Sequence, residues 1–131
     1  MSTDQEIQQI LKDTKTIAVV GISHKEHRAS YQVAKFLIEK GYTVIPVNPK
    51  YEEVLGQACY AKLEDIPVAV DMVDCFRRSE EIVPIAESAI RIGAKVLWMQ
   101  LGVENDDAAE MAKSAGMQVV MNRCPKIDYR G

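Results

Sequence analysis

The sequence predicts an α/β fold, a Rossmann-like doubly wound sheet of five parallel strands with helices on both faces. Short apolar, β-branched runs alternate with segments of helical period, and glycine or proline marks each change of period. This alternation is typical of parallel strands joined by right-handed crossovers, with an expected strand order of 3-2-1-4-5. The length of 131 residues, without a linker or repeat, predicts a single domain over 1–131.

The first half of the chain predicts an outer helix followed by a strand-helix-strand unit. Ile7, Ile10 and Leu11 follow helical spacing, so residues 1–13 are expected to form a helix packed on the domain. Gly41 is expected to end the next helix, because glycine readily adopts the left-handed conformation found there. The strand-helix-strand unit is predicted at 16–21, 31–40 and 42–47.

The second half begins with a connection at 48–67 whose mixed polarity predicts a long loop with one short helix. Pro84 is expected in the first turn of its helix, since a deeper proline would remove a hydrogen bond and clash. Asn105 is expected to cap the following helix, with acidic residues at its positive end. The predicted elements are a strand at 70–76, a helix at 79–92, a strand at 95–99, a helix at 105–115 and a strand at 117–121.

Charge and composition exclude several classes of partner. An apolar fraction of 47% and a net charge of −3 indicate a globular protein without the positive field needed for nucleic acid or anionic membranes. No apolar run approaches the roughly 20 residues of a spanning helix, so we expect a cytoplasmic protein with no membrane partner. Cys59, Cys75 and Cys124 lack the spacing of a zinc site or disulfide framework and are expected to be reduced thiols.

Ligands of open α/β sheets bind outside the carboxyl ends of the strands, so chemistry is expected at that edge. The loop from Gly21 to Ser30 ends at a helix N-terminus, whose unpaired N–H groups suit a phosphate. The glycine fingerprint of dinucleotide-binding domains would need glycine where Ser23 and Glu26 stand, which argues against a standard NAD turn. The segments expected at this edge are 21–30, 47–51, 76–79, 100–103 and 122–125.

The end of the second strand distinguishes between nucleotides. NAD-binding domains place an acid there, whereas this chain has Asn48, Pro49 and Lys50. Lys50 suits a ribose phosphate, which coenzyme A and NADP both carry, although an ordinary turn at Asn48 and Pro49 is an equal alternative. Arg28 and Arg77 add cations at the same edge, where a solvated charge is the alternative for each taken singly.

Three other groups of residues have types that could serve catalysis or metal binding. His24 and His27 have the HxxH spacing, but no carboxylate or cysteine set completes a metal site, so we expect ordinary loop histidines. Cys124 could act as a nucleophile at the active edge, but no base partner follows it, which favours a structural thiol. Asp71 and Asp74 are three residues apart in a strand and should point to opposite faces, so no carboxylate pair is expected.

Six strings follow the edge in order: VGIS at 20–23, RAS at 28–30, YTVIPVNP at 42–49, VDCFRRS at 73–79, WMQLGV at 98–103 and NRCP at 122–125. Together they resemble the stand-alone CoA-binding domain proteins, which are similar to the N-terminal domain of the succinyl-CoA synthetase α subunit. The resemblance runs from about Thr14 to the C-terminus and implies coenzyme A as the bound cofactor.

The resemblance also implies which residues bind coenzyme A. The pyrophosphate turn and its phosphate contacts would be Gly21, Ile22, Ser23, Arg28 and Ser30. The end carrying the adenosine 3′-phosphate would be cradled by Val47, Asn48, Pro49 and Lys50. The adenine or pantetheine would be covered by Phe76 and Arg77. The far end would be lined by Gln100, Leu101, Gly102, Asn122, Arg123, Cys124 and Pro125.

The function expected from these features is a protein that binds CoA or acyl-CoA without catalytic machinery of its own. In the ligase, the phosphorylated histidine and the nucleotide-activating parts lie in further domains and subunits, so ligase activity is not implied. One alternative is a small enzyme that acts on acyl-CoA or uses NADP. Another is an interaction module whose protein partner supplies the catalytic parts.

Overall fold

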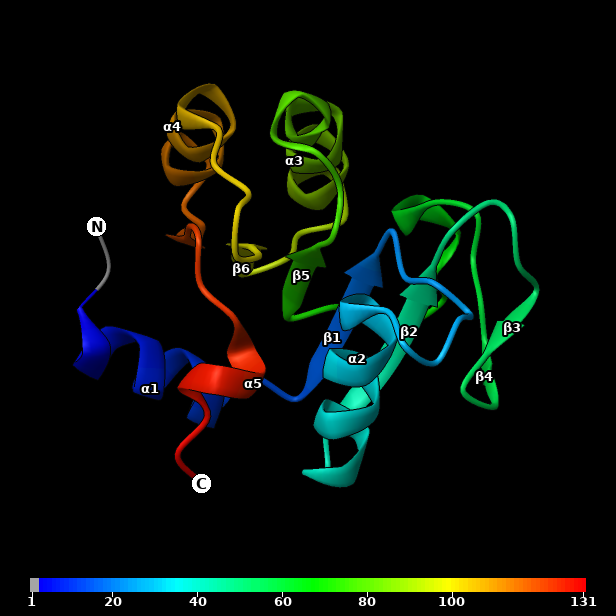
Figure 1. The fold of residues 1–131 in the computed structure, drawn as a ribbon. Helices are drawn as coiled ribbons and strands as arrows, with labels where there is room; N and C mark the ends of the chain where they lie inside the picture. Colours follow the sequence, from blue (N-terminus) through cyan, green and yellow to red (C-terminus); the bar gives the residue numbers. More distant parts are fainter. Residues whose placement is uncertain (1–2) are drawn as a thin grey trace.

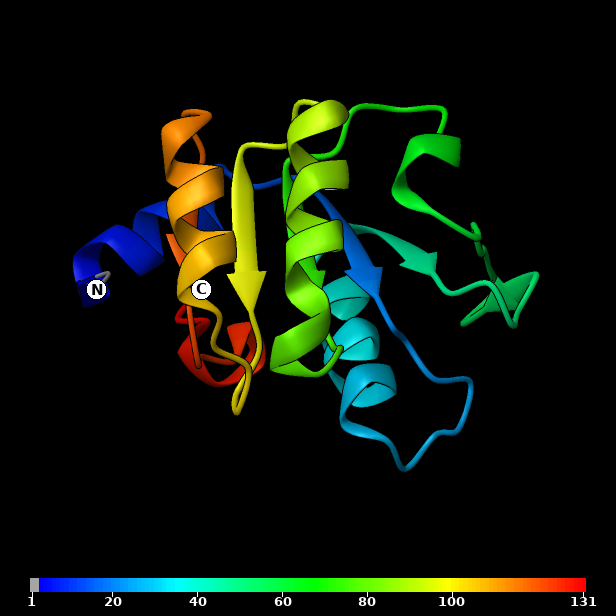
Figure 2. The ribbon, with the colours of Figure 1, turned by 90° about the horizontal axis from the view of Figure 1, so that it is seen from above.

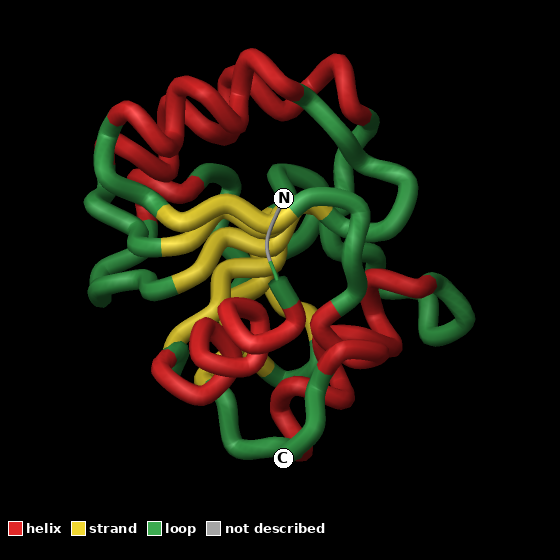
Figure 3. Tube along the Cα trace, turned by 90° about the vertical axis from the view of Figure 1, so that its left-hand side faces the viewer, coloured by secondary structure: helices red, strands yellow, loops and turns green. Residues whose placement is uncertain are grey.

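The computed structural model describes residues 3–131, whose helices lie on both faces of a parallel sheet (Figure 1). Figure 3 shows the sheet as a layer between two helical layers, which confirms the predicted α/β class. The five strands of the sheet are β1 (Thr16–Val20), β2 (Thr43–Val47), β5 (Met72–Cys75), β6 (Val96–Met99) and β7 (Gln118–Val120). The α-helices are α1 (Asp4–Asp13), α2 (Ala29–Glu39), α3 (Ile82–Arg91), α4 (Asp106–Ser114) and α5 (Pro125–Asp128).

The strand order is β2-β1-β5-β6-β7, so the expected order 3-2-1-4-5 is wrong. After β2 the chain turns back, and Tyr60 pairs with the outer edge of that strand through backbone hydrogen bonds to Pro46 and Asn48. The outer edge of β2 is thus partly occupied at its carboxyl end, and β5 instead pairs with the opposite side of β1, where all four of its residues are buried. The chain therefore reverses its direction across the sheet between β1 and β5, which is the switch point where such folds bind ligands.

The connection at 48–67 contains a short hairpin that the sequence pattern did not predict. It consists of β3 (Glu53–Val54) and β4 (Gln57–Ala58), followed by a 3-10 turn, η1 (Leu63–Asp65). The hairpin turns through Leu55 and Gly56, which both have positive φ, as a tight turn of this kind requires. Leucine is not a residue that signals such a turn, so the motif is hidden in the sequence.

Each helix is placed by local signals and by one apolar face. Thr3 and Glu6 form a capping box on α1, and Asn105 caps α4 by accepting from the N–H of Ala108 at 2.9 Å. Pro84 is the third residue of α3, within the first turn as expected, behind the short 3-10 helix η2 (Ser79–Glu81). The part of the N-terminal helix prediction that falls on residues 1 and 2 lies outside the described residues.

Two apolar cores hold the helices to the sheet. One lies under α3 and α4, and the other under α1 and α2, where Ile7, Ile10 and Leu11 are buried as expected for an outer helix packed on the domain. Trp98 of β6 is fully buried in the second core. Within residues 3–131, no helix is long and apolar enough to cross a membrane.

Candidate ligand site at the carboxyl edge of the sheet

The loops that follow the parallel strands gather at one edge of the molecule. Figure 2 shows β1 and β6 pointing toward the same side, where the loop after β1 and the loop after β6 emerge. All five segments predicted at this edge follow the carboxyl end of a strand. The fold therefore brings the predicted site residues to one edge.

Gly21 forms a turn that leaves no room for a side chain. Its φ is +86°, and a Cβ at this position would lie 2.5 Å from the carbonyl oxygen of Phe76 and 2.7 Å from Cδ of Arg77. The turn is fixed in place because the N–H of Gly21 donates to Val47 and the N–H of Phe76 donates to Val20. The backbone of the first turn thus packs directly against the end of β5, at the switch point.

The loop after Gly21 leads into the N-terminus of α2. Ser30 is buried in the first turn of this helix, and its hydroxyl accepts from the N–H of Ser23 at 2.9 Å. Arg28 is the N-cap residue, and its guanidinium has no acceptor atom with which to cap the helix N–H groups. The first-turn N–H groups are thus not capped by a side chain, which is the arrangement that suits an anion.

Asn48 joins the loop after β2 to the loop after β1. Its Nδ2 donates to the carbonyl oxygen of Ile22 at 2.8 Å, and its Oδ1 accepts from the N–H of Lys50 at 2.9 Å. The rings of His24 and Tyr51 meet edge to face, 4.5 Å apart, across the same two loops. The side chain of Asn48 therefore has a structural role at the predicted turn, while exposed Lys50 brings a cation to the edge.

The four cations expected near the site differ in how they are paired. Arg77 Nη2 lies 2.9 Å from Glu81, and Arg123 contacts both Asp128 and Asp4. These two carboxylates hold the pKa of Arg123 above its usual range. Within the described part of the chain, Arg28 and Lys50 have no carboxylate within salt-bridge distance, which makes them the cations best suited to a phosphate.

The loops after β6 and β7 form the far end of the site. Asn122, in the left-handed conformation, accepts from the N–H of Gly102 at 2.7 Å and so joins the two loops. Leu101 is exposed beside them, whereas Cys124 is buried immediately before Pro125, the first residue of α5. The guanidinium of Arg123 connects α1 with α5, so it serves the structure more directly than a ligand.

Asp74 is a residue whose importance the sequence reasoning missed. It is fully buried, neither of its carboxyl oxygens has a hydrogen-bond partner, and burial raises its pKa well above the usual range. Asp71 differs, because it accepts from the N–H groups of Lys15 and Thr16 at the amino end of the sheet. The signal that could have identified Asp74 was an acid inside an otherwise apolar strand.

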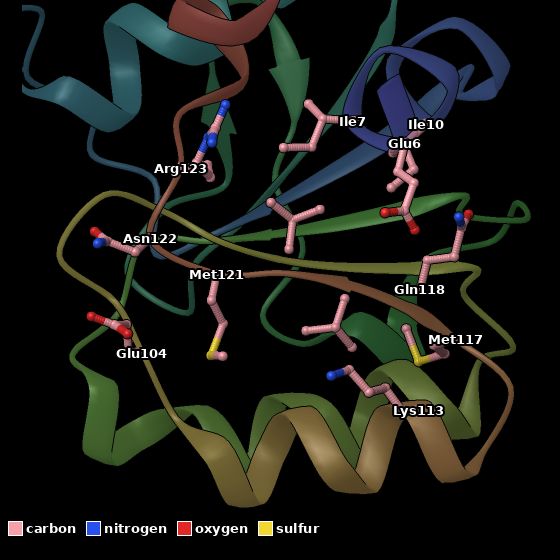
Figure 4. Close-up of a pocket in the computed structure, with 12 residues that line it drawn as sticks. Glu6, Ile7, Ile10, Glu104, Lys113, Met117, Gln118, Met121, Asn122 and Arg123 are labelled. Carbon is pink, nitrogen blue, oxygen red and sulfur yellow. The ribbon is translucent and has the colours of Figure 1, made fainter. Parts of the chain in front are cut away.

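A separate cleft of about 740 Å³ runs along the edge strand β7, between α1 and α4 (Figure 4). Ile7, Met117 and Met121 contribute apolar walls, and Asn122 and Arg123 stand at the end nearest the predicted site. The other predicted site residues do not line this cleft. The cleft is therefore distinct from the phosphate-type turn after β1, because β5 and β6 lie between β1 and β7.

Comparisons place these features among known proteins. Residues 15–130 match the family described as the CoA binding domain. The chain is 41% identical over 124 residues to the uncharacterized protein YneT of Bacillus subtilis (strain 168), covering 95% of this chain and 92% of that protein. A solved structure of a hypothetical protein from Pyrococcus horikoshii OT3 has a TM-score of 0.94 at 45% identity, covering 97% of this chain and 89% of the other.

A longer relative shares the same region. The ADP-forming acetate–CoA ligase I of Archaeoglobus fulgidus is 30% identical over 120 residues, covering 84% of this chain but 18% of the ligase. The similarity thus corresponds to one part of a much larger protein.

Proposed function

Since the chain belongs to the CoA-binding domain family, we propose that it binds coenzyme A, free or acylated, at the carboxyl edge of its sheet. The observation that carries the proposal is the junction of the Gly21 turn with the uncapped N-terminus of α2, flanked by Arg28 and Lys50. Coenzyme A has a pyrophosphate for the turn and helix N-terminus, and a ribose 3′-phosphate for a separate cation.

The same features favour coenzyme A over a nicotinamide dinucleotide. Gly21 allows close backbone approach, but Ser23 and Glu26 replace the glycines of the dinucleotide fingerprint. NADP also carries a ribose phosphate, so Lys50 alone does not separate the two ligands. The family membership and the fingerprint together support coenzyme A.

We propose further that the chain has no catalytic machinery of its own. The two histidines lie in the loop after β1, whereas Cys124 is buried at the far end of the site, so the histidines and this thiol follow strands that β5 and β6 separate. Two alternatives stay open. One is a small enzyme that acts on acyl-CoA or uses NADP, and the other is a module whose catalytic parts come from a protein partner. The match to 18% of the acetate–CoA ligase supports the second alternative, because in that protein the similar region is accompanied by a much longer chain. The cytoplasmic location stays a prediction.

Isothermal titration calorimetry with CoA, dephospho-CoA and NADP tests the binding proposal. We expect Lys50→Ala to lower the affinity for CoA about tenfold, because it removes a charge-assisted hydrogen bond to the 3′-phosphate. The affinity for dephospho-CoA, which lacks this phosphate, should be unchanged. Arg28→Ala should lower the affinity for both CoA and dephospho-CoA, because its expected phosphate contact is not the 3′-phosphate and is therefore common to the two ligands. Lys113→Ala, which removes an exposed lysine of α4, is the matched control. Saturable binding of NADP without binding of CoA would refute the proposal, and turnover of any acyl-CoA would refute the absence of catalysis.

A further inference from the structure

Three buried side-chain oxygens in the described part of the chain have no hydrogen-bond partner. They are both carboxyl oxygens of Asp74 and Oε1 of Gln100. Asp74 is completely buried and Gln100 is 6% exposed. A buried acceptor without a donor is costly, and native proteins rarely leave one unpaired. Three such atoms on two residues, one in β5 and one directly after β6, therefore point to a function.

The two residues lie toward the carboxyl ends of the neighbouring strands β5 and β6. Asp74 of β5 is paired in register with Trp98 of β6, and Gln100 follows Trp98 by two residues. Alternate residues of a strand point to the same face, so Asp74 and Gln100 are diagonal neighbours on one face of the sheet. Ile22, in the first turn, and Cys124, after β7, pack into the core on that same face.

A ligand that extends from the Gly21 turn toward Cys124 must cross the ends of β5 and β6, because these strands lie between β1 and β7. In coenzyme A, the segment between the pyrophosphate and the thiol is the pantetheine arm, which contains two amide groups. A carboxamide side chain suits an amide, since each has one donor side and one acceptor side. Gln100 is the side chain of this kind at the ends of these two strands.

Asp74 can fix the direction in which Gln100 presents its carboxamide. Burial favours the neutral carboxyl form of Asp74, and a neutral carboxyl has an O–H to donate. If that O–H donates to Oε1 of Gln100, one orphaned acceptor is satisfied and the carboxamide N–H groups turn toward the edge of the sheet.

Building on the proposed function, we propose that Asp74 and Gln100 form the pantetheine subsite of this chain. Gln100 donates from its carboxamide to an amide carbonyl of the arm. Asp74, a positioning residue, holds the carboxamide by donating its O–H to Oε1 of Gln100. The subsite recognises the part of the ligand that adenosine 3′,5′-bisphosphate lacks.

Calorimetry with CoA and with adenosine 3′,5′-bisphosphate tests this subsite. Asp74→Leu removes the donor at similar volume, and Gln100→Met removes the carboxamide at similar length. We expect each variant to lower the affinity for CoA by about fivefold to tenfold. The double variant should lower this affinity no further, because the two residues act as a unit. Asp74→Asn keeps a donor and should stay within about threefold of the wild type. All variants should bind adenosine 3′,5′-bisphosphate like the wild type.

Two further measurements separate positioning from a general structural effect. Infrared difference spectra should show a protonated carboxyl band that is absent in Asp74→Asn, and that shifts on addition of CoA but not of adenosine 3′,5′-bisphosphate. Met72→Leu, a conservative change on the same strand and face, should leave both affinities unchanged. Thermal melts of each variant establish that it is folded before titration.

The possible results distinguish a failure of the pantetheine subsite from a failure of the proposed CoA binding. Equal weakening of both ligands by Asp74→Leu overturns the subsite, and so does an Asp74→Asn variant as weak as Asp74→Leu. A wild type that binds CoA and adenosine 3′,5′-bisphosphate with the same affinity also overturns the subsite while leaving the proposed function intact. A wild type that binds neither ligand overturns the proposed function itself.

Discussion

Replacing Gly21 by alanine tests whether the first turn depends on close contact between two backbones. Gly21 and Gly41 both have a left-handed φ, at +86° and +96°, so alanine is strained at either position. A Cβ at Gly41 would meet nothing within 4 Å, whereas a Cβ at Gly21 would lie 2.5 Å from the backbone oxygen of Phe76. Gly41→Ala is therefore the matched control, because it has the conformational strain without the clash.

The two variants should differ in the free energy of unfolding. The left-handed conformation costs alanine about 1–2 kcal/mol, which is the whole effect expected at Gly41. At Gly21 the clash adds about 1–3 kcal/mol, because the carbonyl belongs to a fixed strand end and cannot rotate away. The expected losses are thus about 1–2 kcal/mol for Gly41→Ala and about 2–5 kcal/mol for Gly21→Ala.

Urea unfolding followed by tryptophan fluorescence measures both losses. Trp98 is the single tryptophan of the chain and is fully buried, so its emission reports the global transition. Gly21→Ala should also lower the affinity for CoA. Gly41→Ala should leave this affinity unchanged, because Gly41 lies at the amino end of β2, away from the site. Equal destabilisation by the two variants, or unchanged CoA affinity in Gly21→Ala, would contradict the role assigned to this turn.

Other predictions concern two buried acidic side chains, Asp74 and Asp128. Burial raises the pKa of Asp74 above its unfolded value of about 3.9, so the folded state retains a proton that the unfolded state releases, and stability should fall as pH rises from that value toward the folded pKa. Asp74→Asn has no such proton, so its stability relative to wild type should increase by about 1.4 kcal/mol per pH unit within this window. Urea titrations of both proteins from about pH 4 upward measure this difference, and parallel stability curves from that pH onward would contradict the raised pKa. Arg123→Ala should cost about 3 kcal/mol, because it leaves buried Asp128 without its partner. The double variant with Asp128→Asn should recover most of this loss in the same assay, and no recovery would show that Arg123 acts through other contacts.

The pattern of elements could be predicted because its signals are local. The β-branched run around Val19, the capping Asn105 and the position of Pro84 each depend on neighbouring residues, and the structure confirms all three. The edge that carries the candidate site follows from the same pattern, since parallel strands direct their carboxyl ends to one side. Family membership was also predictable, because its ordered strings lie at those strand ends.

The pairing of distant segments could not be predicted in this way. The pairing of β5 with β1, and of Tyr60 with the outer edge of β2, joins segments far apart in the sequence, so no local pattern announces the strand order. The sequence shows cations near the edge, but not that Arg77 pairs with Glu81 and Arg123 with Asp128, whereas Arg28 and Lys50 pair with no carboxylate of the described residues.

Asp74 illustrates the division between sequence and tertiary structure. The sequence by itself determined that an acid stands within an apolar strand, because periodicity and composition are properties of neighbouring residues. Only the tertiary structure decided that this strand is central, that no donor reaches the carboxyl group, and that Gln100 is its neighbour. The physical reason is that burial and hydrogen-bond satisfaction depend on which strands lie side by side, and long-range packing makes that choice.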